Sequence, residues 1–150
     1  MTKKQQETKE LNLIHKRNKG ILRPADVVDF ARDKKTALHN KFEWNNGKAA
    51  DKYRLQQARQ LITVYVEYIN TGSETKEVQV YVSLTPDRKK TNGGYRKTID
   101  ILSNKVQKKQ LLEDAYYELQ TFVNKYGHLQ ELASTITAAI KDLQKRKKAS

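Results

Sequence analysis

The spacing of hydrophobic residues divides the chain into segments that predict different elements. Residues 1–19 are polar and rich in Lys and Gln, and their only large apolar side chains are Leu11, Leu13 and Ile14. So few apolar groups do not hold a helix against a core. We therefore expect residues 1–23 to form a basic mobile tail.

Three helical segments are expected next. The first begins at Pro24, whose ring suits a first helical turn, and carries Asp26 near its positive N-terminal end. Residues 36–42 predict one or two helical turns. Residues 48–61 are strong helix formers and predict a third helix, which Asn45 or Asn46 can cap.

Some side chains in this helical part are expected to serve packing. Phe42 and Trp44 flank Glu43 and predict an aromatic plug that closes the helical part of the core. Arg54 falls within the apolar arc of the third helix. Its guanidinium is therefore expected to pair with the carboxylate of Asp51 or Glu43 while its stem packs.

The hydrophobic period then changes to two. Residues 62–69 and 78–84 alternate and are rich in β-branched and aromatic residues, so they predict the strands of a hairpin. Residues 95–97 predict a short third strand, and 99–102 a helical turn. Helix, short helix, helix and hairpin is the order of a winged helix-turn-helix, here within a domain of residues 24–103. Two features argue against that motif. The turn before the cap of the third helix lacks glycine, and no loop separates that helix from the following strand.

Residues 104–144 carry a heptad repeat. Its two series are Leu112, Leu119, Tyr126, Ala133 and Ile140, and Ala115, Phe122, Leu129, Ile136 and Leu143. This spacing predicts a continuous helix of about 40 residues. A helical hairpin broken near Gly127 is the alternative. We expect this segment to pack on the domain or to mediate association through Leu112, Leu119, Phe122, Tyr126, Leu129, Ile136 and Ile140.

The predicted fold class is α+β and mainly helical. It combines short N-terminal helices, a two- to three-stranded antiparallel hairpin sheet and the heptad helix, followed by a basic tail at 145–150. The chain has no cysteine, which excludes disulfide scaffolds, cysteine zinc sites and thiol catalysis. No apolar run approaches the roughly 18 residues of a membrane helix, and the start lacks the apolar part of a signal peptide. We expect no membrane partner.

The net charge of +13 is unevenly distributed. The excess of bases lies in residues 1–23, 45–62, 85–109 and 145–150, whereas residues 110–144 have a net charge of −3. A local excess of bases indicates a surface for an anion, whereas a uniform excess indicates solubility. The distribution therefore favours an anion-binding body with a separate association surface.

Two basic segments are candidates for nucleic-acid contact. On the third helix, Lys48, Lys52, Gln56 and Arg59 share one face, where Arg and Gln can contact base edges. In the loop after the hairpin, bases surround two glycines whose flexible backbone permits close approach to phosphate, and Tyr95 can stack on a base. The loop candidates are Arg88, Lys89, Lys90, Tyr95, Arg96 and Lys97. The alternatives are a solvated helix face and a solvated hairpin loop.

Catalytic and metal chemistry is not expected. His15, His39 and His128 lie far apart and lack ligand spacing with one another or with carboxylates, so no metal or other cofactor is predicted. Acidic residues of the heptad segment, such as the pair Glu113-Asp114 and Glu118, are expected to face solvent. No Ser, His and acid arrangement suggests a triad, and we expect no enzymatic activity.

One segment resembles a known group of proteins. Residues 37–62 contain Leu38-His39 followed by Phe42-Glu43-Trp44, and then the run Ala49-Ala50-Asp-Lys-Tyr-Arg-Leu-Gln-Gln-Ala-Arg59. They resemble small, mostly uncharacterised bacteriophage and prophage proteins that share the pattern L-H-x-x-F-E-W followed by A-A-x-x-Y-R-L-x-x-A-R. The likeness covers most of residues 24–143 and departs at Asn45-Asn46, where acidic residues are common in the group, and in the lysine-rich ends. It implies a phage origin and no established activity.

These observations predict a phage-encoded, non-enzymatic DNA-binding protein with a regulatory role. Its expected partners are duplex DNA and further copies of itself, and its expected location is the cytoplasm of a bacterial host, with the virion as an alternative. The competing hypothesis is a phage structural or host-interaction protein that binds a protein partner through the C-terminal heptad helix.

Overall fold

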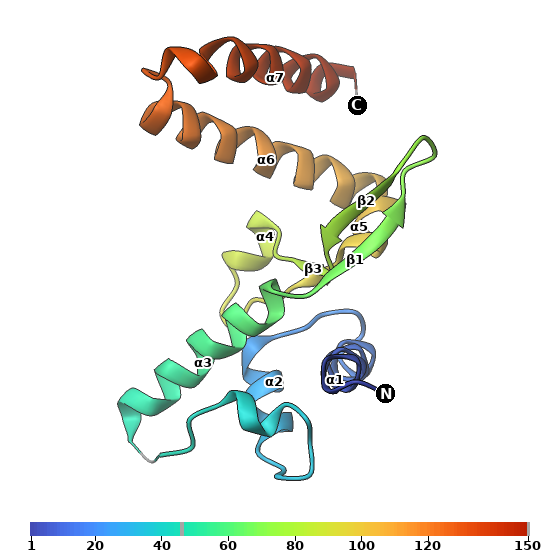
Figure 1. The fold of residues 1–150 in the computed structure, drawn as a ribbon, viewed down its shortest axis with the longest axis vertical. Helices are drawn as coiled ribbons and strands as arrows, with labels where there is room; N and C mark the ends of the chain where they lie inside the picture. Colours follow the sequence, from blue (N-terminus) through green and yellow to red (C-terminus); the bar gives the residue numbers. More distant parts are fainter. Residues whose placement is uncertain (46, 150) are drawn as a thin grey trace. The chain divides into compact units, whose positions relative to one another are not determined.

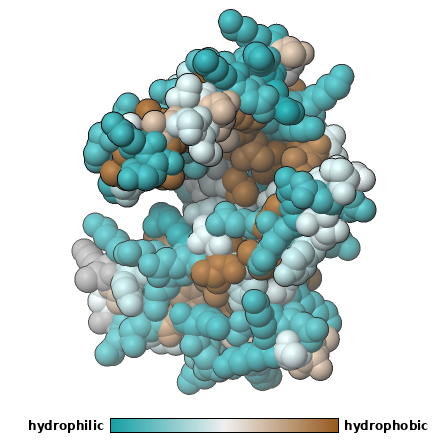
Figure 2. All heavy atoms as spheres, turned by 45° about the horizontal axis from the view of Figure 1, so that its top comes forward, coloured by the Kyte–Doolittle hydropathy of each residue, from teal (hydrophilic) through white to brown (hydrophobic). Residues whose placement is uncertain are grey.

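The computed structural model describes residues 1–45 and 47–149, with the side chains of Lys48 and Ala49 also left out. The chain divides into two compact units, Met1–Asp100 and Ile101–Ser150. The fold is α+β and mainly helical, as predicted (Figure 1). Figure 2 shows a largely hydrophilic surface interrupted by apolar patches. No helix within the described residues is long and apolar enough to cross a membrane.

The first unit begins with helix α1 (Lys3–Arg17), so the expected mobile tail is wrong. Thr2 and Gln5 form a capping box in which each side chain accepts a hydrogen bond from the other's backbone N–H. Leu11 and Ile14 are buried in the core. These two apolar side chains suffice to anchor the helix, because polar side chains of the same helix also form hydrogen bonds and ion pairs within the unit.

Those polar contacts join α1 to distant parts of the sequence. The buried Glu10 carboxylate accepts hydrogen bonds from the backbone N–H groups of Ala37 at 2.9 Å and Leu38 at 3.0 Å. The Glu7 carboxylate accepts a 2.7 Å hydrogen bond from the Tyr65 hydroxyl and pairs with Lys41 at 3.2 Å. Burial and this hydrogen bond to Glu7 raise the pKa of Tyr65.

Helices α2 (Pro24–Ala31) and α3 (Lys48–Thr63) build most of the remaining core, with the short 3-10 turn η1 (His39–Lys41) between them. Pro24 lies in the first turn of α2, as predicted. Helix α3 continues to Thr63, although the alternating pattern predicts a strand from Ile62. Leu61 and Ile62 are both buried, because both lie on the inner side of the last helical turns.

The strands form two small sheets, and not the single sheet expected. Strand β1 (Val66–Asn70) pairs antiparallel with β2 (Thr75–Gln79), with Val66 opposite Gln79. Strand β3 (Tyr81–Val82) pairs with β4 (Arg96–Lys97), the short strand predicted at 95–97. The predicted strand 78–84 divides because Val80 and Tyr81 are both buried, which a regular alternating strand does not allow.

Short helices follow strands β3 and β4. Helix α4 (Thr85–Arg88) occupies the start of the predicted loop, and α5 (Thr98–Ser103) contains the helical turn predicted at 99–102. An isolated bridge joins Leu22 to Tyr95, with both backbone hydrogen bonds at 2.8 Å. The bridge ties the segment before α2 to the far end of the loop.

The second unit is a helical hairpin of α6 (Lys105–Tyr126) and α7 (Gln130–Ala149), which run antiparallel (Figure 1). The continuous helix is wrong, and the alternative break near Gly127 is confirmed, because Gly127 is the C-cap residue of α6. The expected basic tail at 145–150 is also wrong up to Ala149. Arg146, Lys147 and Lys148 lie in the last turn of α7, where they suit the negative end of the helix dipole.

Candidate nucleic-acid interface

A pocket of about 460 Å³ in the first unit brings the two predicted basic segments together. Helix α3 contributes Arg59, and the loop contributes Arg88, Lys90 and Tyr95. Among the described residues, no acidic side chain lines this pocket. Three cations in one concavity attract an anion.

The rest of the pocket lining is apolar or neutral. Pro24 and Leu55 supply aliphatic surface, and Ser83, Asn92 and Gly93 supply polar atoms. The pocket therefore combines a cationic part with an apolar and aromatic part. Such a mixture suits a ligand that is charged at one end and flat or apolar at the other.

Helix α3 places its predicted stripe on the surface. Lys52, Gln56 and Arg59 are all exposed and lie within one face at 100° per residue. None of the described residues forms a hydrogen bond or ion pair with the Arg59 guanidinium. Lys48 begins the helix, and its side chain lies outside the described residues. Of this stripe, only Arg59 reaches the pocket lining.

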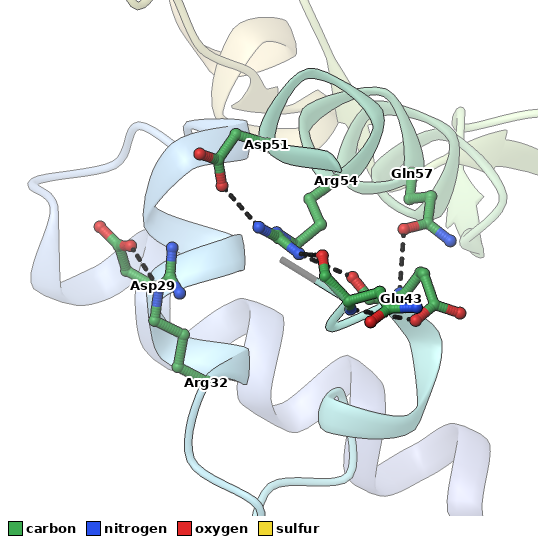
Figure 3. Close-up of polar contacts among 7 residues, drawn as sticks. Asp29, Arg32, Glu43, Asp51, Arg54 and Gln57 are labelled. Carbon is green, nitrogen blue, oxygen red and sulfur yellow. Dashed lines mark hydrogen bonds and ion pairs between the residues drawn. The ribbon is translucent and has the colours of Figure 1, made fainter. Parts of the chain in front are cut away.

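The N-terminal part of α3 is fixed by Arg54, which is buried as expected (Figure 3). Its guanidinium pairs with the Asp51 carboxylate at 2.6 Å and donates to the Glu43 carbonyl oxygen at 2.9 Å. The predicted carboxylate partner is therefore Asp51, whereas Glu43 is contacted through its backbone. This hydrogen bond lowers the pKa of Asp51.

Aromatic packing supports the same end of the helix. Trp44 stacks on the His39 ring at 5.0 Å and donates a 2.9 Å hydrogen bond to the His39 carbonyl oxygen. Phe42 is buried against Trp44, with ring centroids 5.6 Å apart. The predicted packing role of Phe42 and Trp44 is confirmed.

A salt bridge fixes the loop that forms the other pocket wall. The Arg96 guanidinium donates two hydrogen bonds to the Asp87 carboxylate, at 2.6 and 2.8 Å. Asp87 is buried, and its acceptance of these bonds raises the pKa of Arg96. Arg96 was predicted to bind nucleic acid, but its guanidinium fork is engaged within the chain. We therefore assign Arg96 to positioning the loop.

The two glycines have a different role from the one predicted. A Cβ at Gly93 would lie 2.0 Å from the Asp87 carbonyl oxygen, and one at Gly94 would lie 2.4 Å from the Ile21 side chain. Asn92 adopts a left-handed φ of 56° just before them. The glycines thus allow the loop to pack closely on itself and on Ile21. The expectation that they keep the backbone flexible for phosphate is replaced by a fixed loop.

The remaining loop candidates differ in their contacts, and only some of them line the pocket. Arg88 donates a 2.6 Å hydrogen bond to the Thr85 hydroxyl and also contacts the Ser83 carbonyl oxygen. Lys89 and Lys90 are both exposed, but only Lys90 lines the pocket. Tyr95 is half-buried, packs on the core and lines the pocket. Lys97 lies away from this lining and acts electrostatically on His15.

Sequence reasoning missed the neutral residues of the pocket, Pro24, Leu55, Ser83 and Asn92. Their sequence signals indicate helix start, helix core, strand end and turn, so none of them indicates a ligand. No group of three His, Asp or Glu suited to a metal ion occurs within residues 1–45 and 47–149.

The predicted association residues divide by exposure in the hairpin. Ile136 is buried, Phe122 and Leu129 are exposed, and the others are half-buried: Leu112, Leu119, Tyr126 and Ile140. Contacts between the helices include Lys147 over the Tyr116 ring at 5.4 Å and a 3.3 Å hydrogen bond from Gln144 to the Tyr116 hydroxyl. Part of the heptad seam is therefore used within the chain, where α6 meets α7. The expectation that Asp114 faces solvent is wrong, because its carboxylate is buried and accepts a 2.9 Å hydrogen bond from the Gln110 side chain.

Comparison of the chain with models of protein families, with curated proteins and with solved structures finds no match. The chemistry of the pocket and of the α3 face therefore has to indicate the function by itself.

Proposed function

We propose that this protein is a non-enzymatic DNA-binding protein that holds duplex DNA through its phosphates. The observation that carries the proposal is the meeting of Arg59, Arg88 and Lys90 in one pocket without an acidic lining residue. Guanidinium and ammonium groups are the usual partners of phosphate oxygens, and such contacts supply most of the non-specific affinity for DNA.

The exposed face of α3 extends this basic surface. Lys52 lies two turns before Arg59 on the same face, and Gln56 lies one turn before it. In our proposal Lys52 contacts phosphate, and Gln56 contacts a base edge in the major groove, where an amide can pair with adenine. We also propose a winged helix-turn-helix docking geometry, with α3 as the recognition helix and the β1–β2 hairpin as the wing.

The biological setting is part of the same proposal. The segment from Leu38 to Arg59 resembles bacteriophage and prophage proteins, so we propose that the protein acts in the cytoplasm of a bacterial host as a regulatory DNA-binding protein. Its location in the virion is the alternative.

The proposal is tested by removing two phosphate contacts from the α3 face. Lys52→Gln with Arg59→Gln should weaken binding to a short duplex at least about tenfold, because a hydrogen bond to a charged group is worth ~1.5–3 kcal/mol. Fluorescence anisotropy on a labelled duplex measures the change.

The matched control is Lys9→Gln with Lys34→Gln, which removes the same charge from exposed positions outside this surface. It should bind within about twofold of the wild type, since only long-range charge is lost. Equal affinities of the two double variants would contradict the proposed surface.

A second candidate function is binding of a protein partner through the C-terminal hairpin, either as a virion component or as a host-interaction factor. The observation that favours it is exposed apolar surface: Tyr117 is 61% exposed, Phe122 41%, and Leu129 and Leu132 each 38%. These side chains lie on α6, on α7 and on the turn between them, and large exposed apolar side chains gathered in one unit are typical of interaction surfaces. Capture of a phage or host protein that persists after nuclease treatment, and is lost in Phe122→Glu, would support this function.

A further inference from the structure

The pocket has a shape that a duplex does not fill. It is a concavity of about 460 Å³, within the range of roughly 300–1,000 Å³ that is usual for small-molecule sites. A duplex is a rod that lies across a surface, and its paired bases are stacked inside it. A backbone phosphate of a duplex can reach the cations at the mouth of the cavity, but only an unpaired nucleotide or a small molecule can place a base or another flat group inside it.

The pocket wall is held in one conformation by the chain itself. The Asp87–Arg96 pair closes the loop, the Ser83 hydroxyl donates a 2.9 Å hydrogen bond to the Gly94 carbonyl oxygen, and Tyr95 is bridged to Leu22. A loop fixed in this way offers a preformed site. Preformed sites bind compact ligands well because little conformational entropy is lost.

The lining separates into two chemical parts. Arg59, Arg88 and Lys90 supply three positive charges, which exceeds the charge of about −2 on one terminal phosphate group. Tyr95, Leu55 and Pro24 supply aromatic and aliphatic surface in the same cavity. Base stacking on an aromatic ring and phosphate pairing with cations are the two interactions that hold single-stranded nucleic acid.

We propose that this pocket binds one unpaired, phosphorylated nucleotide, with its phosphate among the three cations and its base against Tyr95. The inference rests on the proposed function for its setting, since a nucleotide at the end of a DNA strand would bring the duplex onto the α3 face. The same chemistry also fits a free mononucleotide. These two sources are separated by the experiment.

The first measurement compares two DNA ligands with the full-length protein. One is a blunt duplex, and the other is the same duplex with a short 5′-phosphorylated single-stranded overhang. The overhang should increase affinity at least about fivefold, the lower end of what stacking one base on an aromatic side chain provides.

Adjacent lysines supply a matched pair of variants. Lys90→Gln and Lys89→Gln remove the same charge from neighbouring exposed positions, but only Lys90 lines the pocket. Lys90→Gln should reduce the gain from the overhang to less than twofold, whereas Lys89→Gln should keep it. Tyr95→Leu, which retains apolar bulk but removes the aromatic ring, should also lose the gain.

A second measurement uses thymidine 5′-monophosphate, with thymidine and inorganic phosphate as comparisons. In NMR amide spectra of the protein, the mononucleotide should shift the signals of Gly93, Tyr95 and Arg59, and each comparison compound should shift them less at equal concentration. Shifts with the mononucleotide but no gain from the overhang would assign the pocket to a free nucleotide.

The outcomes separate the two proposals. Blunt-duplex binding without either the overhang gain or the mononucleotide shifts overturns the nucleotide pocket and leaves the proposed function standing. Mononucleotide shifts without any duplex binding overturn the proposed function and retain the pocket. If Lys89→Gln and Lys90→Gln lose the affinity gain from the overhang equally, nucleotide binding in the pocket is also overturned. The gain would then depend on the total charge of the loop and not on a side chain that lines the pocket.

Discussion

At the scale of single residues, the salt bridge between Asp87 and Arg96 has the greatest effect on the site, because it holds the loop that carries Arg88 and Lys90. The exposed fractions of the two side chains are 7% and 26%, so water competes little for their hydrogen bonds. Removing one partner of such a pair leaves the other without compensation in a part-buried position.

Asp87→Asn should therefore lower the free energy of unfolding by about 2 kcal/mol, within the range for hydrogen bonds to charged groups. Urea denaturation measures this change in the free energy of unfolding. Asp87→Asn combined with Arg96→Gln should cost less than the sum of the two single variants, because the pair is coupled. Strict additivity of the three values would contradict a structural role for this pair.

A second prediction at this scale concerns His15. Burial lowers the pKa of its imidazole below 6.5, opposed by Asp100 and reinforced by Lys97. The unfolded chain then takes up the proton at a higher pH than the folded chain. Stability should consequently decrease as pH falls through 6.5 towards the lower folded pKa.

The measurement is urea denaturation of wild type and His15→Gln between about pH 7.5 and 5.5. The wild type should lose stability over this interval, and the variant should lose less. Parallel pH profiles of the two proteins would show that His15 does not titrate with the predicted shift.

Residue roles could be predicted where the partners are close in sequence. Arg54 lies three positions from Asp51 on one helix, so helical geometry predicts their pairing, and the structure confirms it. Arg96 and Asp87 are nine positions apart and are joined by a turn. The sequence does not indicate whether that turn brings them together, and Arg96 was consequently assigned to nucleic acid.

At the scale of elements, helix α1 shows how a polar helix can belong to a core. Leu11 is fully buried, whereas Leu13, two residues later, is 40% exposed. Leu11→Ala should cost about 2–5 kcal/mol of unfolding free energy, the range for truncating a buried leucine. Leu13→Ala should change it by about 0.5 kcal/mol or less.

Denaturation of both variants by urea provides the comparison, with Leu13→Ala as the control for helix propensity. Similar small effects of the two substitutions would indicate that residues 3–17 do not pack as described.

The sequence predicts a mobile tail at the N-terminus because apolar residues are few there. The carboxylates of Glu7 and Glu10 supply the missing contacts through partners 27 to 58 residues away, which no local pattern reveals.

The two-helix hairpin was predicted only as an alternative for a related reason. A heptad repeat is satisfied equally by a continuous helix that meets a partner and by two helices that meet each other. Gly127 is the only local signal that distinguishes them, and it is a weak one. The order of helices and strands in residues 24–103 was more predictable, because the hydrophobic period changes from helical to alternating near Thr63.

At the scale of the whole molecule, we propose that the first unit binds DNA and that the second unit mediates self-association. We expect self-association through the hairpin, because Phe122 and Leu129 remain exposed after α6 and α7 have paired. Light scattering should give a mass above that of one chain for the wild type. Phe122→Glu with Leu129→Glu should give the mass of a monomer, and a wild type that is already monomeric would contradict this expectation.

The pocket itself could not have been predicted as a unit. Its cations were identified from the sequence on α3 and on the loop, but their meeting depends on the bridge from Leu22 to Tyr95 and on the close packing of Gly93 and Gly94. The bridge from Leu22 to Tyr95 and the contact of Gly94 with Ile21 each join residues about 70 positions apart, beyond the reach of periodicity and spacing.

The most direct test of the central claim is the salt dependence of duplex binding. The claim is that a fixed basic surface pairs with DNA phosphates, so the logarithm of affinity should fall linearly with the logarithm of salt concentration, by about 0.9 per phosphate contacted. Arg59→Gln should make that slope shallower by about 0.9, and Lys9→Gln should leave it unchanged. Affinity that does not change with salt, or the same slope for Arg59→Gln and wild type, would contradict the claim.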